Sequence, residues 1–267
     1  MKILSIGNSF SVDAQRFVRH IAGADNVDIV LGNLYIGGCT LDRHCENMRS
    51  GLPAYEYFKN NESLGYTSLL TGLKDEDWDY ITLQQGSHFS GIWDTYVPHL
   101  TDLAEYVKSI CPKAEIVIHE TWAYEYNSTH HAFVNYNSDR HEMHARLHDC
   151  YYKAAEILGV RVIPVGDAVD AARSNALFDP EKGGTQLSRD GFHMGWRLGR
   201  YLASAVWYEF FTGNDVRKNT FVPMDMQYLG TVDGVVQQKP LEGSEPDKEL
   251  MSLLKEIAHN TVSAMRG

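Results

Sequence analysis

The first eleven residues constrain the fold more than any other stretch of the chain. Residues 2–6 (Lys-Ile-Leu-Ser-Ile) have the character of a short buried strand, and residues 12–24 carry apolar side chains at helical spacing. A Gly-Asn turn separates the two, so Ser9 lies where a strand ends and its helix begins. In an open α/β sheet this edge opens onto a crevice that often holds functional groups. Alternatively, Ser9 or Ser11 only caps the helix.

Strands and helices alternate along the rest of the chain. The patterning predicts further strands near residues 27–36, 80–83, 114–118 and 161–165. It predicts helices near residues 96–110, 139–158, 195–211 and 249–264. Residues 60–72 contain a polar turn or short hairpin. Such an alternation calls for a parallel sheet covered by helices on both faces.

The 267 residues fit one large domain, with residues 214–267 as a C-terminal extension that packs on it. A net charge of −11 argues against nucleic acid or an anionic membrane as the main partner. The N-terminal apolar run is too short for a signal peptide, and no 18-residue apolar span occurs. We therefore expect a cytoplasmic protein, or a secreted or periplasmic one if a signal peptide was removed. The final helix could form a homodimer contact.

Two features could indicate cysteine or metal chemistry. The four cysteines form no CxxC pair, so free thiols are expected, with Cys39 as a small packing residue. His141, His144 and His148 share one face of a predicted helix, with Glu142 nearby. Because no HExxH motif accompanies them, we expect no metal and no cofactor; metal-dependent hydrolysis through this helix is an alternative.

Asp190 and His193 are three residues apart, shortly before the helix at 195–211. At this spacing the carboxylate can reach the imidazole, fix its tautomer and stabilise the imidazolium that forms when His193 takes a proton. A base of this kind can activate a serine hydroxyl. The combination of a strand-end Ser9 and a late Asp-x-x-His therefore predicts nucleophilic catalysis.

The order of four motifs resembles that of SGNH/GDSL hydrolases. Residues 7–9 (Gly-Asn-Ser) are similar to the opening Gly-Asp-Ser block, and residues 37–40 (Gly-Gly-Cys-Thr) to the second block. Residues 84–88 (Gln-Gln-Gly-Ser-His) stand in place of the third block, and residues 190–193 match the closing block. The resemblance covers residues 1 to about 212. It is strongest to the carbohydrate-esterase and sialate O-acetylesterase-like branches, and extends to an uncharacterised bacterial family of the superfamily.

The resemblance implies a three-layer α/β/α sandwich with a five-stranded parallel, flavodoxin-like sheet. Ser9 would be the nucleophile, His193 the general base and then acid, and Asp190 the orienting carboxylate. The oxyanion hole would consist of the N–H groups of Ser9 and Gly38 with a side chain from the third block.

Two departures from the family pattern concern the oxyanion region. Asn8 replaces the usual Asp of the opening block, away from the nucleophile. The third block lacks the usual Gly-x-Asn. We assign the third oxyanion donor to the Gln85 amide, with Gln84 and His88 as the alternatives.

The predicted activity is hydrolysis of small acyl esters, most simply acetyl esters on carbohydrates, through an acyl-enzyme without a cofactor. Gln84, His88 and Trp122 are the expected substrate-binding residues, and aromatic side chains in the loop at 123–138 could stack on sugars. The altered third block favours one rival, a glycan-binding descendant with weak or no catalysis. A nucleotide-binding flavodoxin-like protein is disfavoured, because no glycine-rich phosphate loop follows a strand.

Overall fold

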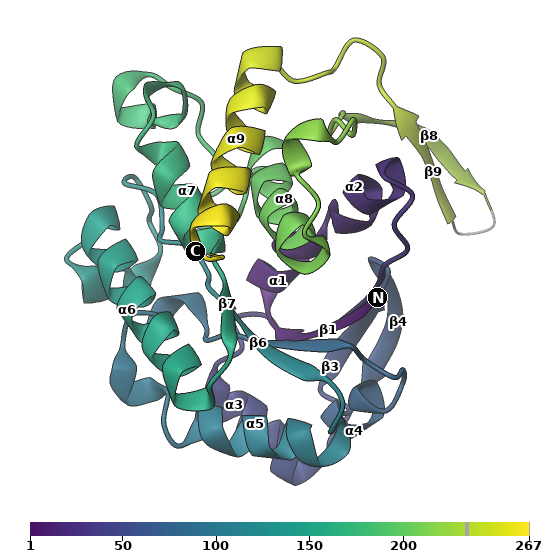
Figure 1. The fold of residues 1–267 in the computed structure, drawn as a ribbon, viewed down its shortest axis with the longest axis vertical. Helices are drawn as coiled ribbons and strands as arrows, with labels where there is room; N and C mark the ends of the chain where they lie inside the picture. Colours follow the sequence, from purple (N-terminus) through teal and green to yellow (C-terminus); the bar gives the residue numbers. More distant parts are fainter. Residues whose placement is uncertain (233–234, 267) are drawn as a thin grey trace.

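The central sheet has seven strands in the order β4-β3-β2-β1-β5-β6-β7. The computed structural model describes residues 1–232 and 235–266. Five of the strands are parallel, which confirms the predicted parallel sheet (Figure 1): β1 (Lys2–Gly7), β2 (Val30–Tyr35), β5 (Tyr80–Leu83), β6 (Glu115–His119) and β7 (Arg161–Ile163). Strand β1 lies in the middle, paired with β2 on one side and with β5 on the other.

An antiparallel hairpin extends the sheet beyond the five predicted strands. Strand β3 (Tyr55–Lys59) pairs with β2, and β4 (Glu62–Thr67) forms the outer edge. The turn between them consists of Asn60 and Asn61, both with positive φ (54° and 69°), as the tight turns of β-hairpins require. The sequence indicated a hairpin near this turn, but not that its first strand joins the main sheet.

Helices cover both faces of the sheet, which confirms the three-layer α/β/α architecture (Figure 1). One layer contains α1 (Ser9–Gln15), α2 (Val18–Ala24), α7 (Val165–Arg173), α8 (Leu198–Thr212) and α9 (Lys248–Ala264). The other contains α3 (Leu41–Ser50), α4 (Leu69–Leu73), α5 (His99–Ile110) and α6 (Arg140–Leu158). Helix α7 was not predicted; β7 ends at Ile163, before Pro164, and α7 starts directly afterwards.

Local signals account for several helix ends. Asn8 caps α1 by accepting a hydrogen bond from the Phe10 N–H, and Asp139 caps α6 in the same way through two N–H groups. Gly159 ends α6 in the left-handed conformation, with φ of 65°. The Asn8 cap makes Ser9 the first residue of α1, shortly after β1.

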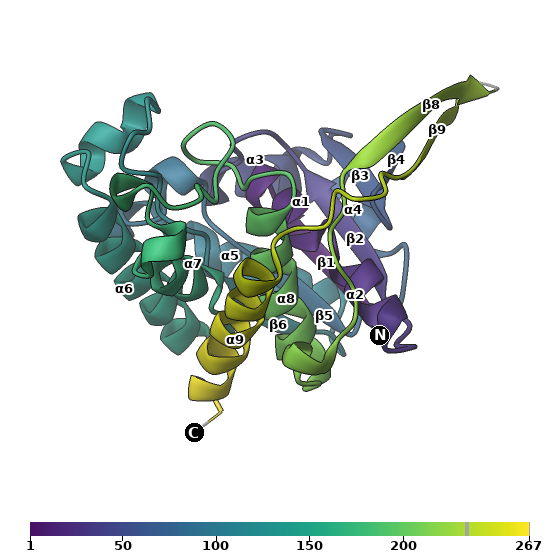
Figure 2. The ribbon, with the colours of Figure 1, turned by 90° about the horizontal axis from the view of Figure 1, so that it is seen from above.

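The C-terminal extension contributes to both the core and the periphery. Helix α9 packs against α7 and α8 and buries Met251, Leu254, Ala258 and Val262. Strands β8 (Met226–Val232) and β9 (Val235–Pro240) form a separate hairpin that projects from the body (Figure 2). Among the described residues, no helix is long and apolar enough to cross a membrane.

Candidate active site

Ser9, His193 and Asp190 form a continuous chain of hydrogen bonds. The Ser9 hydroxyl lies 2.8 Å from His193 Nε2, and His193 Nδ1 lies 2.7 Å from Asp190 Oδ2. Donation from Nδ1–H to the carboxylate leaves Nε2 as the acceptor of the serine proton, which is the arrangement of a nucleophile with its base and orienting acid. The structure thus brings together the three residues that the sequence singled out.

Hydrogen bonds within the loop that carries Asp190 and His193 hold its conformation. Asp190 Oδ1 accepts the N–H groups of Phe192 (3.2 Å) and His193 (2.8 Å). Burial by itself raises the pKa of Asp190, but the hydrogen bonds from the His193 ring and from these two N–H groups outweigh it, so the pKa lies below its usual value. Gly191 has φ of +88°, and a Cβ there would stand 2.9 Å from Ser128 Cα, so the loop needs glycine.

Asp13, one helical turn after Ser9, fixes this loop to α1. Its carboxylate accepts the Met194 N–H at 3.0 Å and forms ion pairs with Arg189 (2.9 Å) and Arg200 (2.7 Å). Only 1% of the Asp13 side chain is exposed. Ser9 is thus on the same short helix that holds the segment carrying His193, through the contacts of Ser9 and Asp13.

Two backbone N–H groups near Ser9 are available to bind an oxyanion. The Ser9 N–H lies at the first turn of α1, and the Gly38 N–H lies in the turn after β2, where φ is +59°. Neither N–H has a hydrogen-bond acceptor within the described part of the chain. Both residues line the same pocket. This agrees with the positions that the sequence assigned to them.

Gln85 does not line this pocket, which corrects its assignment as the third oxyanion donor. Its side chain is fully buried, with Nε2 donating to Thr95 O and Oγ1 (both 3.0 Å) and Oε1 accepting the Leu41 N–H (2.9 Å). The amide therefore ties α3 to the loop after β5. From the third block, Ser87 and His88 line the pocket instead.

Gln84 is likewise structural and not in contact with the pocket. Its Nε2 donates to Asn8 Oδ1 (2.8 Å), and its Oε1 lies 2.7 Å from His119 Nδ1. Asn8 Nδ2 in turn donates to Cys39 O (3.1 Å). This buried network explains the departure from the usual Asp: position 8 needs both a donor and an acceptor, and a carboxylate supplies only acceptors.

Trp122 also supports the site from beneath and is not a substrate-binding side chain. It is fully buried, stacks on Phe10 with ring centroids 4.3 Å apart, and donates from Nε1 to Phe192 O (2.7 Å). Most of the aromatic side chains in the following loop are buried as well: Tyr124, Phe133 and Tyr136. The loop aromatics thus form core rather than a sugar platform.

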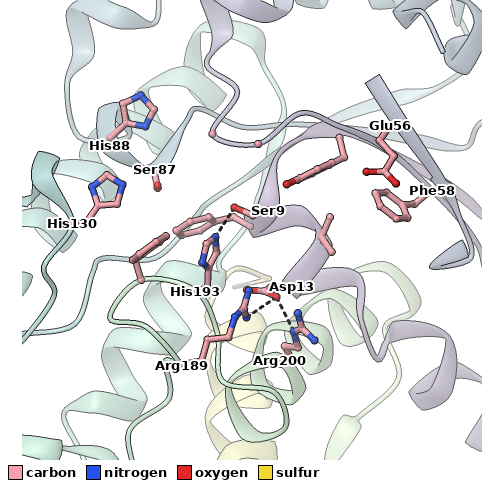
Figure 3. A pocket seen from close by; sticks show the side chains of 16 residues that line it. Ser9, Asp13, Glu56, Phe58, Ser87, His88, His130, Arg189, His193 and Arg200 are labelled. Atoms are coloured by element: carbon pink, nitrogen blue, oxygen red, sulfur yellow. Dashed lines mark hydrogen bonds and ion pairs between the residues drawn. The ribbon is translucent and has the colours of Figure 1, made fainter. Parts of the chain in front are cut away.

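The pocket has a volume of about 580 Å³ and two walls on either side of Ser9 (Figure 3). His88 and His130 lie on one side, where burial lowers the pKa of both imidazoles. Glu56 and Phe58 of β3 lie on the other. Apart from His88, the sequence did not identify these wall residues.

The sequence analysis also assigned no site role to the other residues that line the pocket: Phe10, Val12, Asp13, Tyr35, Ser87, Arg189, Phe192 and Arg200. Burial alternates along β3, with Tyr55 and Tyr57 buried and Glu56 and Phe58 on the pocket side, but residues 55–59 carry no local sequence signal for this. Cys39 is buried beside the glycine turn, and burial raises the pKa of its thiol to about 12, so it is no thiolate nucleophile at neutral pH.

The fold is that of the SGNH/GDSL hydrolases. One edge of the sheet carries a serine at a strand-to-helix turn, a glycine turn after the next strand, and a late Asp-x-x-His. Solved structures agree. A candidate SGNH hydrolase from Slackia heliotrinireducens is 23% identical with a TM-score of 0.55, over 78% of this chain and 97% of its own. An acetyl-xylooligosaccharide esterase from Geobacillus, studied as a mutant, is 14% identical with a TM-score of 0.50, over 79% of this chain and 91% of its own.

The particular family follows from two further matches. The family model described as "Domain of unknown function (DUF4886)" matches residues 2–230. A DUF4886 family protein from Bacteroides uniformis is 33% identical with a TM-score of 0.85, over 98% of this chain and 95% of its own. The chain belongs to the DUF4886 family. A search of curated proteins gave no match.

Proposed function

We propose that this protein is a serine esterase that removes small acyl groups, with acetyl esters of carbohydrates as its substrates. The observation that carries the proposal is the hydrogen bond of 2.8 Å between Ser9 and His193 Nε2, continued at 2.7 Å to Asp190. The rival of a non-catalytic glycan-binding protein expects a broken Ser9–His193 contact, which these distances disfavour.

The reaction follows from this geometry. Ser9 Oγ attacks the ester carbonyl carbon while His193 Nε2 takes the hydroxyl proton, and Asp190 stabilises the imidazolium. His193 then gives the proton to the leaving alcohol oxygen as the C–O bond breaks, which leaves an acyl group on Ser9. A water molecule repeats the sequence, releases the carboxylic acid and restores Ser9. The N–H groups of Ser9 and Gly38 bind the oxyanion of both tetrahedral intermediates.

We assign the third oxyanion donor to the Ser87 hydroxyl. Ser87 Oγ lies 2.9 Å from the Tyr124 hydroxyl and lines the pocket with Ser9 and Gly38. When Tyr124 donates its phenolic proton to Ser87, the Ser87 hydrogen is free to point at the oxyanion.

The shape and lining of the pocket support a carbohydrate ester. A cavity of about 580 Å³ is larger than an acetyl group needs, so the alcohol part of the substrate also fits there. Tyr35 and Phe58, with ring centroids 5.8 Å apart, offer apolar faces, and Glu56 offers acceptors for hydroxyl groups. The acetyl-xylooligosaccharide esterase mentioned above shares this fold, which is consistent with the proposal.

The decisive experiment is hydrolysis of p-nitrophenyl acetate and acetylated xylooligosaccharides by wild type and Ser9→Ala, with and without EDTA. We expect the serine variant to lose at least ~10³-fold in kcat, since the nucleophile is gone, and initial rates to be unaffected by EDTA. Equal activity in both proteins would remove Ser9 as the nucleophile. Loss of rate with EDTA in a protein that stays folded by circular dichroism would instead support metal-dependent hydrolysis.

A further inference from the structure

A second cluster of functional side chains lies away from the pocket, between β6, α6 and α7. It contains His144 and His148 of α6, Asp167 of α7, and Glu120, the residue after β6. One potential ligand atom from each of the first three lies within 4.8 Å of the others. His141, which shares the sequence pattern, is exposed and takes no part. None of the four residues lines the pocket around Ser9.

The arrangement has an unused, buried acceptor. Glu120 is fully buried; its Oε2 accepts the Asp167 N–H at 3.0 Å, whereas Oε1 has no hydrogen-bond partner. This free oxygen lies 3.5 Å from His148 Nδ1. In the part of the chain that the structure describes, no lysine or arginine lies within 4.0 Å of the Glu120 or Asp167 carboxylate. The two carboxylates of the cluster therefore have only histidines, and no lysine or arginine, as cationic neighbours among the described residues.

We propose that His144, His148, Asp167 and Glu120 bind a divalent transition-metal ion of the Zn²⁺ class. Two spacings between potential ligand atoms are close to the edge of a tetrahedral site, about 3.3 Å at metal distances near 2.0 Å. His144 Nε2 lies 3.5 Å from Asp167 Oδ1, and His148 Nδ1 lies 3.5 Å from Glu120 Oε1. A third spacing, His148 Nδ1 to Asp167 Oδ1 at 2.8 Å, must lengthen when the ion binds.

The surroundings of the cluster fit a metal centre. The Tyr152 hydroxyl donates to Asp167 Oδ2 at 2.8 Å, which is how outer partners orient a ligating carboxylate. A Cβ at position 166 would stand 2.8 Å from Glu120 Cδ, so Gly166 is what lets α7 approach this carboxylate. With Glu120 as the fourth ligand the coordination shell would be closed, and the ion would then be structural: it would join α6 and α7 to the end of β6.

A second triad of similar residues provides a contrast within the same chain. Glu209, Asp215 and His259 also bring their ligand atoms within 4.8 Å of one another. There, however, Glu209 Oε2 accepts the Val216 N–H and Asp215 is held by Arg217 through two hydrogen bonds of 2.8 and 2.9 Å. A cation would have to displace an arginine, so we expect no binding at this triad.

The test is titration of the chelator-stripped full chain with Zn²⁺ alone, in competition with a chromophoric chelator. Wild type should bind one tight equivalent. His148→Ala and Asp167→Asn should each weaken Zn²⁺ binding at least ~100-fold. Loss of a residue that only orients a ligand already costs up to about 100-fold, and loss of a ligand should cost more. His141→Ala on the same helix and His259→Ala in the second triad are the matched controls and should bind as wild type does. No tight uptake by wild type, or equal affinities in all five proteins, would overturn the proposal.

Two further measurements keep the test independent of folding and of the esterase proposal. Zn²⁺ at 100 times its Kd should raise the Tm of wild type by roughly 5–10 °C and leave that of His148→Ala unchanged. X-ray absorption of the loaded protein should show nitrogen and oxygen ligands near 2.0–2.1 Å without sulfur; a sulfur shell would place the ion elsewhere. Ser9→Ala should bind Zn²⁺ with unchanged affinity, so failure of either proposal leaves the other standing.

Discussion

Ser9 and Asp13 lie four residues apart on α1, and each holds a different part of the segment that carries the base. Ser9 contacts His193 directly, at 2.8 Å, whereas Asp13 accepts the N–H of the next residue, Met194, at 3.0 Å. Residues at this spacing lie on one face of a helix. The distance between Ser9 and His193 is thus set by one turn of helix and not by a flexible side chain alone.

Removing the Asp13 charge should disturb both stability and catalysis. In Asp13→Asn, Arg189 and Arg200 lose the carboxylate that pairs with them, and we expect a cost of about 3 kcal/mol and a fall in Tm of roughly 6–12 °C. Because the loop is released, kcat should fall while KM changes little. Asp28→Asn, at an exposed carboxylate, is the control. Unchanged kcat in a folded Asp13→Asn protein would show that Asp13 does not position the base.

Asp190→Asn should lower kcat by ~10³–10⁴-fold, because the amide cannot stabilise the imidazolium of His193.

The same variant should change how the stability of the protein depends on pH, because the pKa of Asp190 is lowered in the folded state. A carboxylate whose folded-state pKa is depressed contributes stability above its unfolded pKa, near 3.8, and loses it as the pH falls through the folded value. Urea unfolding should therefore show an advantage of wild type over Asp190→Asn at pH 5–7 that shrinks as the pH falls below 3.8; an advantage that stays constant with falling pH contradicts this.

Restoring the usual Asp of the opening block should destabilise the protein. In Asn8→Asp a carboxylate oxygen would face Cys39 O, now 3.1 Å from Asn8 Nδ2, at a position only 1% exposed. We expect a loss of at least about 2 kcal/mol, since a donor becomes a buried acceptor. The midpoint of urea unfolding measures it. A variant as stable as wild type would mean that the network around Gln84 rearranges at no cost.

Ser87→Ala should lower the rate of catalysis, whereas Gln85→Leu should lower the stability of the fold. Loss of an oxyanion donor at position 87 should lower kcat by ~10²-fold or more at similar stability. Loss of the Gln85 amide leaves the Leu41 N–H without its acceptor, and should cost about 1–3 kcal/mol of stability. Steady-state kinetics and thermal melting of the two variants distinguish the roles. A large rate loss only in the folded Gln85 variant would return the oxyanion role to that residue.

Phe58→Ala should affect substrate binding and not the chemical step. Removing an aromatic face from the pocket wall costs roughly 1 kcal/mol, which corresponds to a rise in KM of about 5- to 10-fold for acetylated oligosaccharides at similar kcat. For p-nitrophenyl acetate, which carries no sugar to stack on Phe58, KM should stay the same. Tyr66→Ala, at a ring that is 72% exposed on the same hairpin, is the control. Equal effects on both substrates would rule out a sugar-binding role for Phe58.

The sequence predicted the parallel sheet and the positions of Ser9, Asp190 and His193, because local patterns determine them. The period of the apolar residues indicates strand or helix, and the end of β1 places Ser9 at the crevice. The spacing of Asp190 and His193 is short enough for a loop to bring them together without any knowledge of the remaining chain.

The corrected residues depend on contacts between distant segments. Gln84 and Gln85 are adjacent in a polar run, and their roles are set by Asn8 on one side and Thr95 on the other. Trp122 lies in a loop that looks exposed, but Phe10 of α1 covers it. Strand β3 joins β2 in a register that no local pattern contains, so its pocket-facing side chains could not be predicted.

The hairpin of β3 and β4 contributes one wall of the pocket but none of the three residues of the Ser9–His193–Asp190 chain. It is attached along a single edge of the sheet, through β2. Under the proposed function, a different hairpin at this edge would change which alcohol part of the ester is accepted and leave Ser9, His193 and Asp190 in place.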